Sequence, residues 1–368
     1  MTIAISLGII LISIYLLAIV TDAFFIESLQ QIAERWKLPH DVAGASLMAM
    51  GSSAPELGIA LLAVFRHGGA HSDVGMGTIV GSAVFNILVI TGVSAMVRPI
   101  VINWKSSIRD SLVYISSIIL LLVVFADGKI TMVEVSAFLG LYATYLIVLV
   151  IWSRMFPQTT DDNIHIADEI IKEEKAETSL LFKFNGMIER IIHIFAGDPS
   201  RSYIRAFVVS ILLIAGLSWL LVDYAVIFSQ AVGLPPVIVA LTILAAGTSA
   251  PDLIASVIVA KQGRGDMAIS NAIGSNIFDI LVGLGLPWLL LILARQMGWL
   301  TGAPVMSVGT QDLWLSTLVL LGSVVLLLTF MMWGKKLSRK EGFVLILCYV
   351  GYVVWTYMSI GGPAVTGS

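Results

Sequence analysis

Three carboxylates lie deep inside long apolar segments of this 368-residue sequence: Glu56, Asp252 and Asp279. An acid at the centre of a membrane-spanning helix costs about 2.5–3.5 kcal/mol on insertion scales, so packing alone does not account for three of them. The Lys and Arg residues stand at the ends of the apolar segments rather than at the depth of the acids. Protons or a bound cation must therefore supply the missing positive charge. Carboxylate oxygens are hard ligands that suit calcium, which takes about six to eight oxygens.

A proline directly precedes two of these acids, at positions 55 and 251. Proline has no amide hydrogen, so a helix that contains it leaves carbonyl oxygens one turn earlier without their usual partner. Broken helices of this kind occur at membrane depth only where they line a protein cavity or a bound ion. The sequence therefore predicts two broken helices that supply backbone oxygens to a cation site. The residues concerned are Pro55 with Gly51 and Ser52, and Pro251 with Gly247 and Thr248.

Hydroxyl and amide side chains lie at helical spacing from the acids. Ser53 and Ser249 each stand three residues before an acid and so share its helix face, where they are candidate ligands for a smaller monovalent ion. Asn276 likewise stands three residues before Asp279, and Asn86 is the counterpart of Asp279 in an internal repeat. We expect the helices that carry these amides to face the helices that carry the acids.

Two motifs of the first half of the chain recur in the second half in the same order. Gly51-Ser-Ser-Ala-Pro-Glu-Leu57 recurs as Gly247-Thr-Ser-Ala-Pro-Asp-Leu253, and Gly81-Ser-Ala-Val-Phe-Asn-Ile-Leu88 recurs as Gly274-Ser-Asn-Ile-Phe-Asp-Ile-Leu281. Because an odd number of spans separates the copies, they must point in opposite directions across a membrane. Inverted repeats of this kind place a substrate site at their interface near the bilayer midplane, which is typical of transporters. Gly81 and Gly274 are expected to allow close helix packing.

The elements that position these residues are predicted to be membrane spans. Hydrophobic residues make up 58% of the chain and charged residues only 12%, which excludes an ordinary soluble domain. The absence of a basic patch with interleaved aromatics excludes nucleic-acid binding. The single cysteine, Cys348, excludes a disulfide framework, and we expect its small side chain to be buried. The apolar runs predict ten spans, near Ile3–Val20, Val42–Val64, Gly75–Met96, Ser111–Ala126, Met132–Trp152, Ala206–Val222, Val237–Val259, Met267–Leu293, Leu313–Trp333 and Phe343–Met358.

The basic residues predict the orientation of these spans. All but Arg66, Lys129 and Arg295 of the 21 Lys and Arg residues fall in alternate connections, which we therefore expect in the cytoplasm. Both termini then face outward. The chain divides into a first five-helix half at residues 1–153, a cytoplasmic loop at 154–202, and a second five-helix half at 203–368.

Within the loop, the charged stretch Asp161–Glu177 is interpreted as a solvated linker, with a regulatory cation site as the alternative. An amphipathic helix on the inner membrane surface is predicted after it. Its apolar residues at helical spacing are Leu180, Phe184, Met187, Ile188, Ile191 and Phe195.

Other titratable residues give weaker signals. Asp22, Asp127 and Asp223 are predicted at span ends, where a carboxylate costs little, and a part in the ion path is the alternative interpretation. Asp266 is expected to cap a helix. The five histidines lie in connections without metal-ligand spacing, so we expect neither a zinc site nor a proton relay.

The repeated motifs resemble those of the calcium/cation antiporters, whose two alpha-repeats carry Gly-[Ser/Thr]-Ser-x-Pro-[Glu/Asp] followed by Gly-Ser-x-x-Phe-[Asn/Asp]. Residues 40–98 and 234–294 look like the alpha-1 and alpha-2 repeats. The closer resemblance is to the potassium-dependent sodium/calcium exchangers, through the segments from Gly75 to Asn86 and from Gly265 to Asp279. It implies an all-α membrane protein with ten transmembrane helices arranged as two inverted five-helix repeats, in a sodium/calcium exchanger-like fold.

The resemblance also implies which ion each residue binds. It makes Glu56 and Asp252 the central ligands that calcium and sodium share. Asp279 occupies the position where the potassium-dependent branch has Asp, so it implies retention of potassium. The implied sets are Glu56, Asp252, Ser52 and Thr248 for calcium, Ser53, Ser249, Asn276, Glu56 and Asp252 for sodium, and Asp279 with Asn276 for potassium, with Asn86, Pro55, Pro251, Gly51 and Gly247 in support.

The function expected from the resemblance is secondary active exchange of sodium for calcium across the plasma membrane, with potassium bound or co-transported. We expect no cofactor, no nucleic-acid partner, and transport by a single chain. A proton/calcium antiporter, in which the same acids cycle through protonation, remains an alternative. A passive cation channel is a further alternative, which the inverted duplication disfavours. Enzyme chemistry is not expected, because no His or Lys base lies in the spans to activate Ser53 or Ser249.

Overall fold

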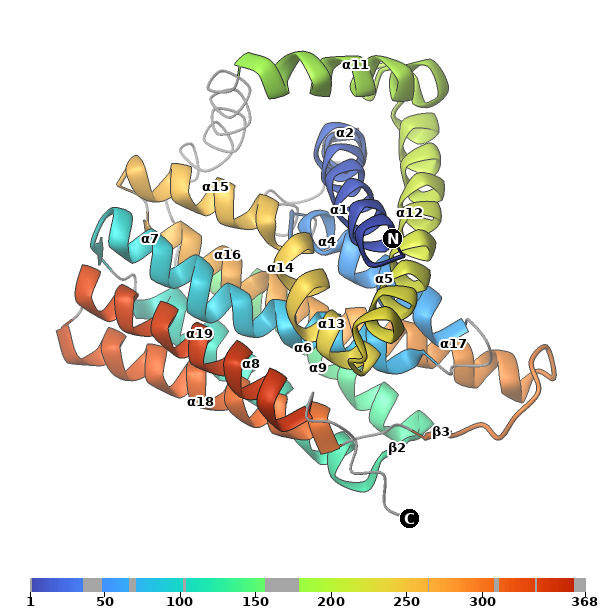
Figure 1. Ribbon diagram of the computed structural model, residues 1–368. Coiled ribbons are helices and arrows are strands. Elements are labelled where there is room, and N and C mark those ends of the chain that lie inside the picture. The colour runs from blue at the N-terminus through green and yellow to red at the C-terminus, as the bar shows by residue number, and fades with distance from the viewer. Residues whose placement is uncertain are drawn as a thin grey trace.

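The computed structural model describes residues 2–35, 48–65, 71–101, 104–155, 179–263, 265–307, 311–334 and 336–360. The predicted linker Asp161–Glu177 and residues 40–47 of the first repeat lie outside these ranges. The described chain is almost wholly helical, with four two-residue strands in its connections (Figure 1).

The helices and strands of the first half follow the repeat order. They are α1 (Thr2–Val20), η1 (Thr21–Ile26), α2 (Glu27–Arg35), α4 (Met48–Ser52), α5 (Ala54–Phe65), α6 (Ser72–Phe85), η4 (Asn86–Ile90), α7 (Thr91–Val97), β1 (Ile100–Val101), α8 (Trp104–Asp127), β2 (Lys129–Ile130) and α9 (Met132–Met155). The η segments are π-helical turns.

Helix α11 (Ser179–Ala196) links the halves, and the second half repeats the pattern of the first. Its elements are α12 (Tyr203–Val232), α13 (Pro236–Val239), η5 (Ala240–Leu244), α14 (Ala245–Thr248), α15 (Ala250–Lys261), α16 (Gly265–Phe278), η6 (Asp279–Leu284), α17 (Gly285–Gln296), β3 (Met306–Ser307), α18 (Gln311–Gly334), β4 (Lys336–Leu337) and α19 (Arg339–Ile360).

The prediction of ten spans is consistent with these helices. In the described part of the chain, eight helices are long and apolar enough to cross a bilayer, and Pro236–Thr248 with Ala250–Lys261 forms a ninth span that is bent by 44°. The remaining predicted span, Val42–Val64, is described from Met48 onward, as α4 and the apolar helix α5.

The helices at the first and sixth predicted spans extend beyond the predicted ends. The first helix continues through η1 to Ile32, and α12 continues to Val232. Asp22 and Asp223 therefore lie inside long helices rather than at helix ends, because one carboxylate is not a helix stop signal. The stop in α12 is Gly233, whose φ of 77° is left-handed and therefore favours glycine.

Helices α1 and α12 pack along each other and form a unit beside the remaining spans (Figure 1). Ile10 and Leu17 of α1 share a buried apolar cluster with Leu221 and Val222 of α12. The larger core lies among α6 to α9 and α16 to α19, where Phe138, for example, packs edge-on against Trp288 at 5.4 Å between ring centroids.

The two halves interlock through the larger core and two short ribbons. Helix α8 packs against α16 and α18, α7 packs against α19, and α9 packs against α17. Strand β1 pairs antiparallel with β4, and β2 pairs antiparallel with β3. Each ribbon therefore joins a connection of the first half to a connection of the second.

Exposed apolar side chains cover the outer faces of several spans, as expected for surfaces that face lipid. Leu112 and Val123 on α8, Leu212 on α12 and Val354 on α19 are among them. Cys348 on α19 is exposed as well, so the prediction that it is buried is wrong. Its helix turns it toward the surface that the surrounding lipid would cover.

The helix predicted in the central loop is present as α11, which lies across the end of α12 (Figure 1). Arg205 holds the two together, because its guanidinium donates to the carbonyl oxygens of Phe195 at 2.9 Å and Ile194 at 3.2 Å. Exposed Met187 and Ile191 extend an apolar face along α11, in agreement with an amphipathic helix.

Candidate cation-binding site

Two broken helices place an acid at the start of their second segments. The first helix breaks at Ser53, between α4 and α5, and the second breaks at Ser249, between α14 and α15. The prolines follow each break in the first turn of the new helix, where a missing amide hydrogen is tolerated. Glu56 and Asp252 stand in the same first turns, where the helix dipole favours a negative charge.

Each broken helix supplies a hydroxyl residue to an acid of the other half. The Thr248 hydroxyl donates to the carbonyl oxygen of Leu244 at 3.1 Å and lies beside the carboxylate of Glu56, a residue that is only 3% exposed. The Ser53 side chain lies beside the carboxylate of Asp279, which is 1% exposed. The two repeats therefore meet at the acids, and each acid of this pair is approached by the opposite half.

The amides of Asn86 and Asn276 meet between the halves in a buried network. Asn276 donates from Nδ2 to the carbonyl oxygen of Ala83 at 3.1 Å and to the hydroxyl of Tyr114 at 2.8 Å. Since a carbonyl can only accept, this bond fixes the orientation of the Asn276 amide. Its Oδ1 accepts from Nδ2 of Asn86 at 2.8 Å. The amide oxygen of Asn86 is then left without a partner among the described residues.

The three acids interact electrostatically with one another inside the protein. Glu56 repels both Asp252 and Asp279, and Asp252 repels Asp279. No three His, Cys, Asp or Glu side chains in the described ranges converge as one metal-ligand cluster. A cation here would therefore take part of its shell from hydroxyl, amide and backbone oxygens, as the sequence predicts.

Several buried oxygens of the site have no hydrogen-bond partner within the described structure. A buried polar atom without a hydrogen-bond partner lowers the stability of the folded protein by roughly 1–3 kcal/mol. In native proteins such an atom commonly marks the place of a bound water or ion. These oxygens come from both halves of the chain and from acids, hydroxyls and an amide. They are Oε2 of Glu56, Oδ1 of Asp279, Oδ1 of Asn86, and Oγ of Ser53 and Ser249.

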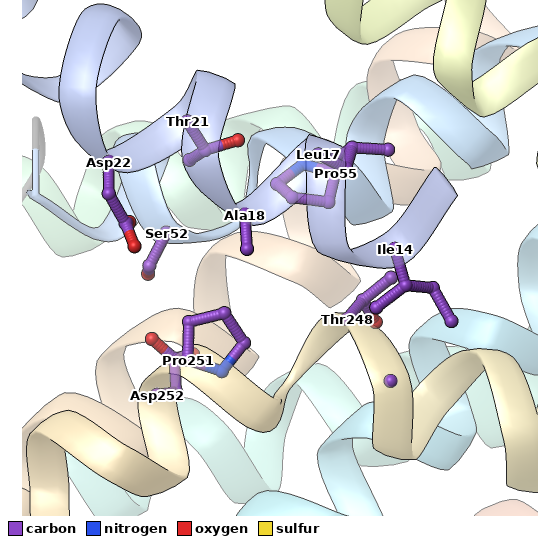
Figure 2. Close-up of a pocket in the computed structure, with 11 residues that line it drawn as sticks. Ile14, Leu17, Ala18, Thr21, Asp22, Ser52, Pro55, Thr248, Pro251 and Asp252 are labelled. Atoms are coloured by element: carbon purple, nitrogen blue, oxygen red, sulfur yellow. The ribbon is translucent and has the colours of Figure 1, made fainter. Parts of the chain in front are cut away.

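The first span, at α1 and η1, and the two broken helices line a cleft. Figure 2 shows the side-chain oxygens of Asp22, Ser52 and Asp252 facing one gap, although they come from three different helices. Ser52 and Asp252 are half-buried, whereas Glu56 lies deeper. The remaining lining residues are Ile14, Leu17, Ala18, Thr21, Pro55, Gly247, Thr248 and Pro251.

Glycines of the repeated motifs differ in how closely they are packed. A Cβ at Gly81 would meet the carbonyl oxygen of Leu241 and, at 2.7 Å, its Cα, so the predicted close approach is confirmed there. At Gly274 no atom of the described residues lies within 4 Å of such a Cβ, so the packing prediction is not borne out at that position. Gly51 and Gly247 abut the side chains of Ile26 and Ile14 from the first span.

Sequence reasoning missed Tyr114, which is fully buried and holds the amide of Asn276 from α8. A tyrosine near the start of an apolar span is ordinary, and no spacing links position 114 to position 276. The sequence gives only a weak signal for Asp22 and none for its neighbour Thr21. The π-helical turn that begins at these two residues could not be predicted from the sequence.

Comparison with known proteins agrees with this architecture. The family model described as "Sodium/calcium exchanger protein" matches residues 5–151 and 202–358. Human "Sodium/potassium/calcium exchanger 4" is 29% identical over 501 residues, which cover 94% of this chain and 79% of the relative. Human "Sodium/potassium/calcium exchanger 5" is 29% identical over 404 residues, with 91% and 79% covered.

Among solved structures, the sodium-calcium exchanger NCX_Mj soaked with Na⁺ and Sr²⁺ superposes with a TM-score of 0.57 at 23% identity. The match covers 96% of this chain and 98% of the other. It supports the fold of two inverted five-helix repeats.

Proposed function

Because this chain belongs to the sodium/calcium exchanger family, we propose that it is a secondary active antiporter that moves calcium in exchange for sodium. It is an integral membrane protein of a transporter family, and its curated relatives are named sodium/potassium/calcium exchangers. Those names include potassium, and we extend its participation to this chain, with potassium bound or carried together with calcium.

The observation that carries the proposal is the set of unpartnered buried oxygens where the two broken helices meet. Glu56, Asp279 and Asn86 each leave an oxygen free there, and Ser53 and Ser249 each leave a hydroxyl free. The basic residues of the chain lie outside the apolar segments. Hard, oxygen-binding cations match this charge and these ligands.

We assign calcium to Glu56 and Asp252, with backbone and hydroxyl oxygens of Ser52 and Thr248. Sodium ions use the same two acids together with Ser53 and Ser249. Because both ions draw on one fixed pair of negative charges, full occupancy by one excludes the other, and this competition couples their movements.

Potassium is assigned to Asp279, beside the amides of Asn86 and Asn276. Since Oδ1 of Asn276 accepts a hydrogen bond from Asn86, the partner-free oxygen at this place is that of Asn86. We propose that Oδ1 of Asn276 binds sodium and potassium through its remaining lone pair. Pro55, Pro251, Gly51 and Gly247 support the site by breaking the helices and admitting the first span.

Alternating access is assigned to the paired helices α1 and α12, which pack along each other and against α5 at one side of the core. We place the protein in the plasma membrane with both termini outside and the loop at 154–202 in the cytoplasm, because the basic residues favour that side. Residues 1–153 and 203–368 then form the two halves, and one chain contains the whole site.

Radioactive calcium uptake into proteoliposomes loaded with sodium tests the proposal. Uptake should require the outward sodium gradient and rise with external potassium when the pH gradient is collapsed. Uptake that ignores sodium and follows an imposed pH gradient would instead identify a proton/calcium antiporter. Calcium conductance without any sodium gradient would identify a channel.

A further inference from the structure

The cleft contains an acid that the exchange site leaves unused. Asp22 lies in η1, is exposed to the cleft, and directs its carboxylate toward the same gap as Ser52 and Asp252 (Figure 2). None of the residues that line the cleft is Lys or Arg. Two carboxylates and a hydroxyl from three helices thus surround a space that is open to a cation.

Thr21, the residue before Asp22, has a hydroxyl group without a hydrogen-bond partner among the described residues. Its side chain lines the same cleft and is only 3% exposed, yet Oγ1 has no hydrogen-bond partner in the described part of the chain. A helical threonine usually bonds a carbonyl oxygen one turn earlier, as Thr78 does with Val74 at 2.8 Å. An unsatisfied hydroxyl at the cleft is therefore available to a ligand.

The local backbone places both residues at the cleft. They begin the π-helical segment Thr21–Ile26, within a helix that is otherwise regular from Thr2 to Ile32. An extra residue in one helical turn changes the direction of the side chains that follow, and such turns occur frequently at functional sites. The π-helical turn therefore begins where the first span brings two polar residues to the lining of the cleft.

We propose that Asp22 and Thr21 form, with Ser52 and Asp252, an access site that binds a calcium or sodium ion on its way to the buried acids. The proposal rests on the proposed exchange function. Two of the groups belong to the first span and two to the broken helices, so a shift of α1 separates them. The access site therefore exists only while the cleft is open, which we expect on the cytoplasmic face.

Sodium-driven calcium exchange in inverted and right-side-out membrane vesicles tests this site from each face. In Asp22→Asn, the half-saturating calcium concentration on the cytoplasmic face should rise about three- to tenfold, as expected for loss of one partly screened charge. The value on the outer face and the rate at saturating calcium should stay unchanged. Asp22→Glu, which keeps the charge, should restore most of the affinity.

Two further variants separate the site from general effects. Thr21→Val removes the free hydroxyl at nearly constant volume and should give a smaller shift on the same face. Glu189→Gln removes a charge from α11 outside the cleft and should give no shift. Equal shifts on both faces in Asp22→Asn, no shift on either, or a shift confined to the outer face would overturn the access site.

Calcium binding to the purified protein, measured by calorimetry, separates a failure of the access site from a failure of the proposed exchange function. Wild-type protein that binds calcium without exchanging it for sodium contradicts the proposed function. If wild type exchanges calcium for sodium and Asp22→Asn has the same half-saturating calcium concentration on both faces, only the access site is contradicted. If Asp22→Asn is poorly inserted, Thr21→Val decides by the same criteria.

Discussion

Asn276 lies where the two halves of the molecule meet, and its partners come from two spans of the first half. It donates to Ala83 of α6 and to Tyr114 of α8, and it accepts from Asn86 of η4. In the repeat, Ala83 is the counterpart of Asn276 itself, so the amide of one copy bonds the backbone of the other. The two copies of the repeat therefore share one hydrogen-bond network that is not symmetric. In it, the Asn276 amide is oriented by Ala83 and in turn accepts a hydrogen bond from the Asn86 amide.

Replacing Asp252 by Asn should abolish sodium-dependent calcium uptake, because the remaining charge at the central site no longer balances a divalent cation. Uptake in proteoliposomes, normalised to inserted protein, measures this. Asp266→Asn, at the start of α16 and outside the site, should keep wild-type uptake. Normal exchange by correctly inserted Asp252→Asn would contradict the assignment of this acid.

Replacing Asp279 by Asn should leave sodium/calcium exchange intact but weaken its dependence on potassium. One negative charge disappears from the proposed potassium site, while Glu56 and Asp252 remain. Titration of external potassium during calcium uptake measures the change. An unaltered potassium curve would show that potassium binds elsewhere.

Replacing Tyr114 by Phe should leave one amide hydrogen of Asn276 unpaired, at a cost of roughly 1–3 kcal/mol. Thermal unfolding in detergent should show the loss, and potassium should bind more weakly because the amides lose their fixed orientation. Tyr142→Phe is a matched control, since Tyr142 packs edge-on against Phe278 at 5.7 Å without a hydrogen bond among those described. Equal behaviour of the two variants would argue against an orienting role for Tyr114.

At the scale of single residues, the sequence predicted the charged and hydroxyl candidates because an acid inside an apolar run is conspicuous. It could not predict which atom of Asn276 faces the site, since that depends on a carbonyl 193 positions away in the chain. Tyr114 escaped for the same reason, as its role exists only after α8 and α16 pack together. Long-range packing, rather than residue type, decided these details.

At the scale of elements, two breaks and four π-helical turns shape the spans near the site in the described chain. Proline in the repeated motifs predicted the breaks, although the helices restart before the prolines instead of ending at them. No residue pattern in the sequence predicted the π-helical turns. Asn86 and Asp279 each begin one of these turns, so the two equivalent site positions share an equivalent distortion.

The contact between α6 and the broken helix tests whether close backbone approach matters. A methyl group at Gly81 would meet the backbone of Leu241 and, at 2.8 Å, the Cβ of Ala245, and backbone atoms cannot turn aside. Gly81→Ala should therefore destabilise the protein by about 1–3 kcal/mol and reduce exchange. Thermal unfolding in detergent together with calcium uptake measures both effects.

Gly322→Ala in α18 is the matched control for this substitution. A Cβ at Gly322 meets nothing within 4 Å among the described residues, and alanine favours a helix over glycine by about 1 kcal/mol. This variant should be as stable as wild type or more stable. If Gly81→Ala behaves in the same way, the close contact at Leu241 does not limit the packing of α6.

At the scale of the whole molecule, the cation site is shared by both halves, so cation binding should stabilise the complete fold. A ligand at a hundred times its dissociation constant contributes about 2.7 kcal/mol by mass action. Calcium should therefore raise the unfolding temperature of the purified protein, and Glu56→Gln should remove most of that increase. An equal increase in Glu56→Gln would place the stabilising calcium outside the proposed site.

The number and order of spans followed from hydrophobic runs, and the inverted duplication followed from the repeated motifs, because both are written locally in the sequence. The pairing of α1 with α12 and the ribbon pairs β1 with β4 and β2 with β3 were not predicted. Strands of two residues carry no pattern of their own. They form because packed helices bring two connections together.

The interlocked core also has a consequence for how the protein is made. The helices α7, α8 and α9 pack against α19, α18 and α17, which the ribosome synthesises last. Asn86 bonds to a residue 190 positions later, so the first half enters the lipid with this amide and Glu56 unmatched. Until the second half is inserted, the nascent first half carries polar groups that only the finished chain can satisfy. Biosynthesis, rather than transport, is therefore the stage at which this molecule is most exposed to misfolding and to quality control.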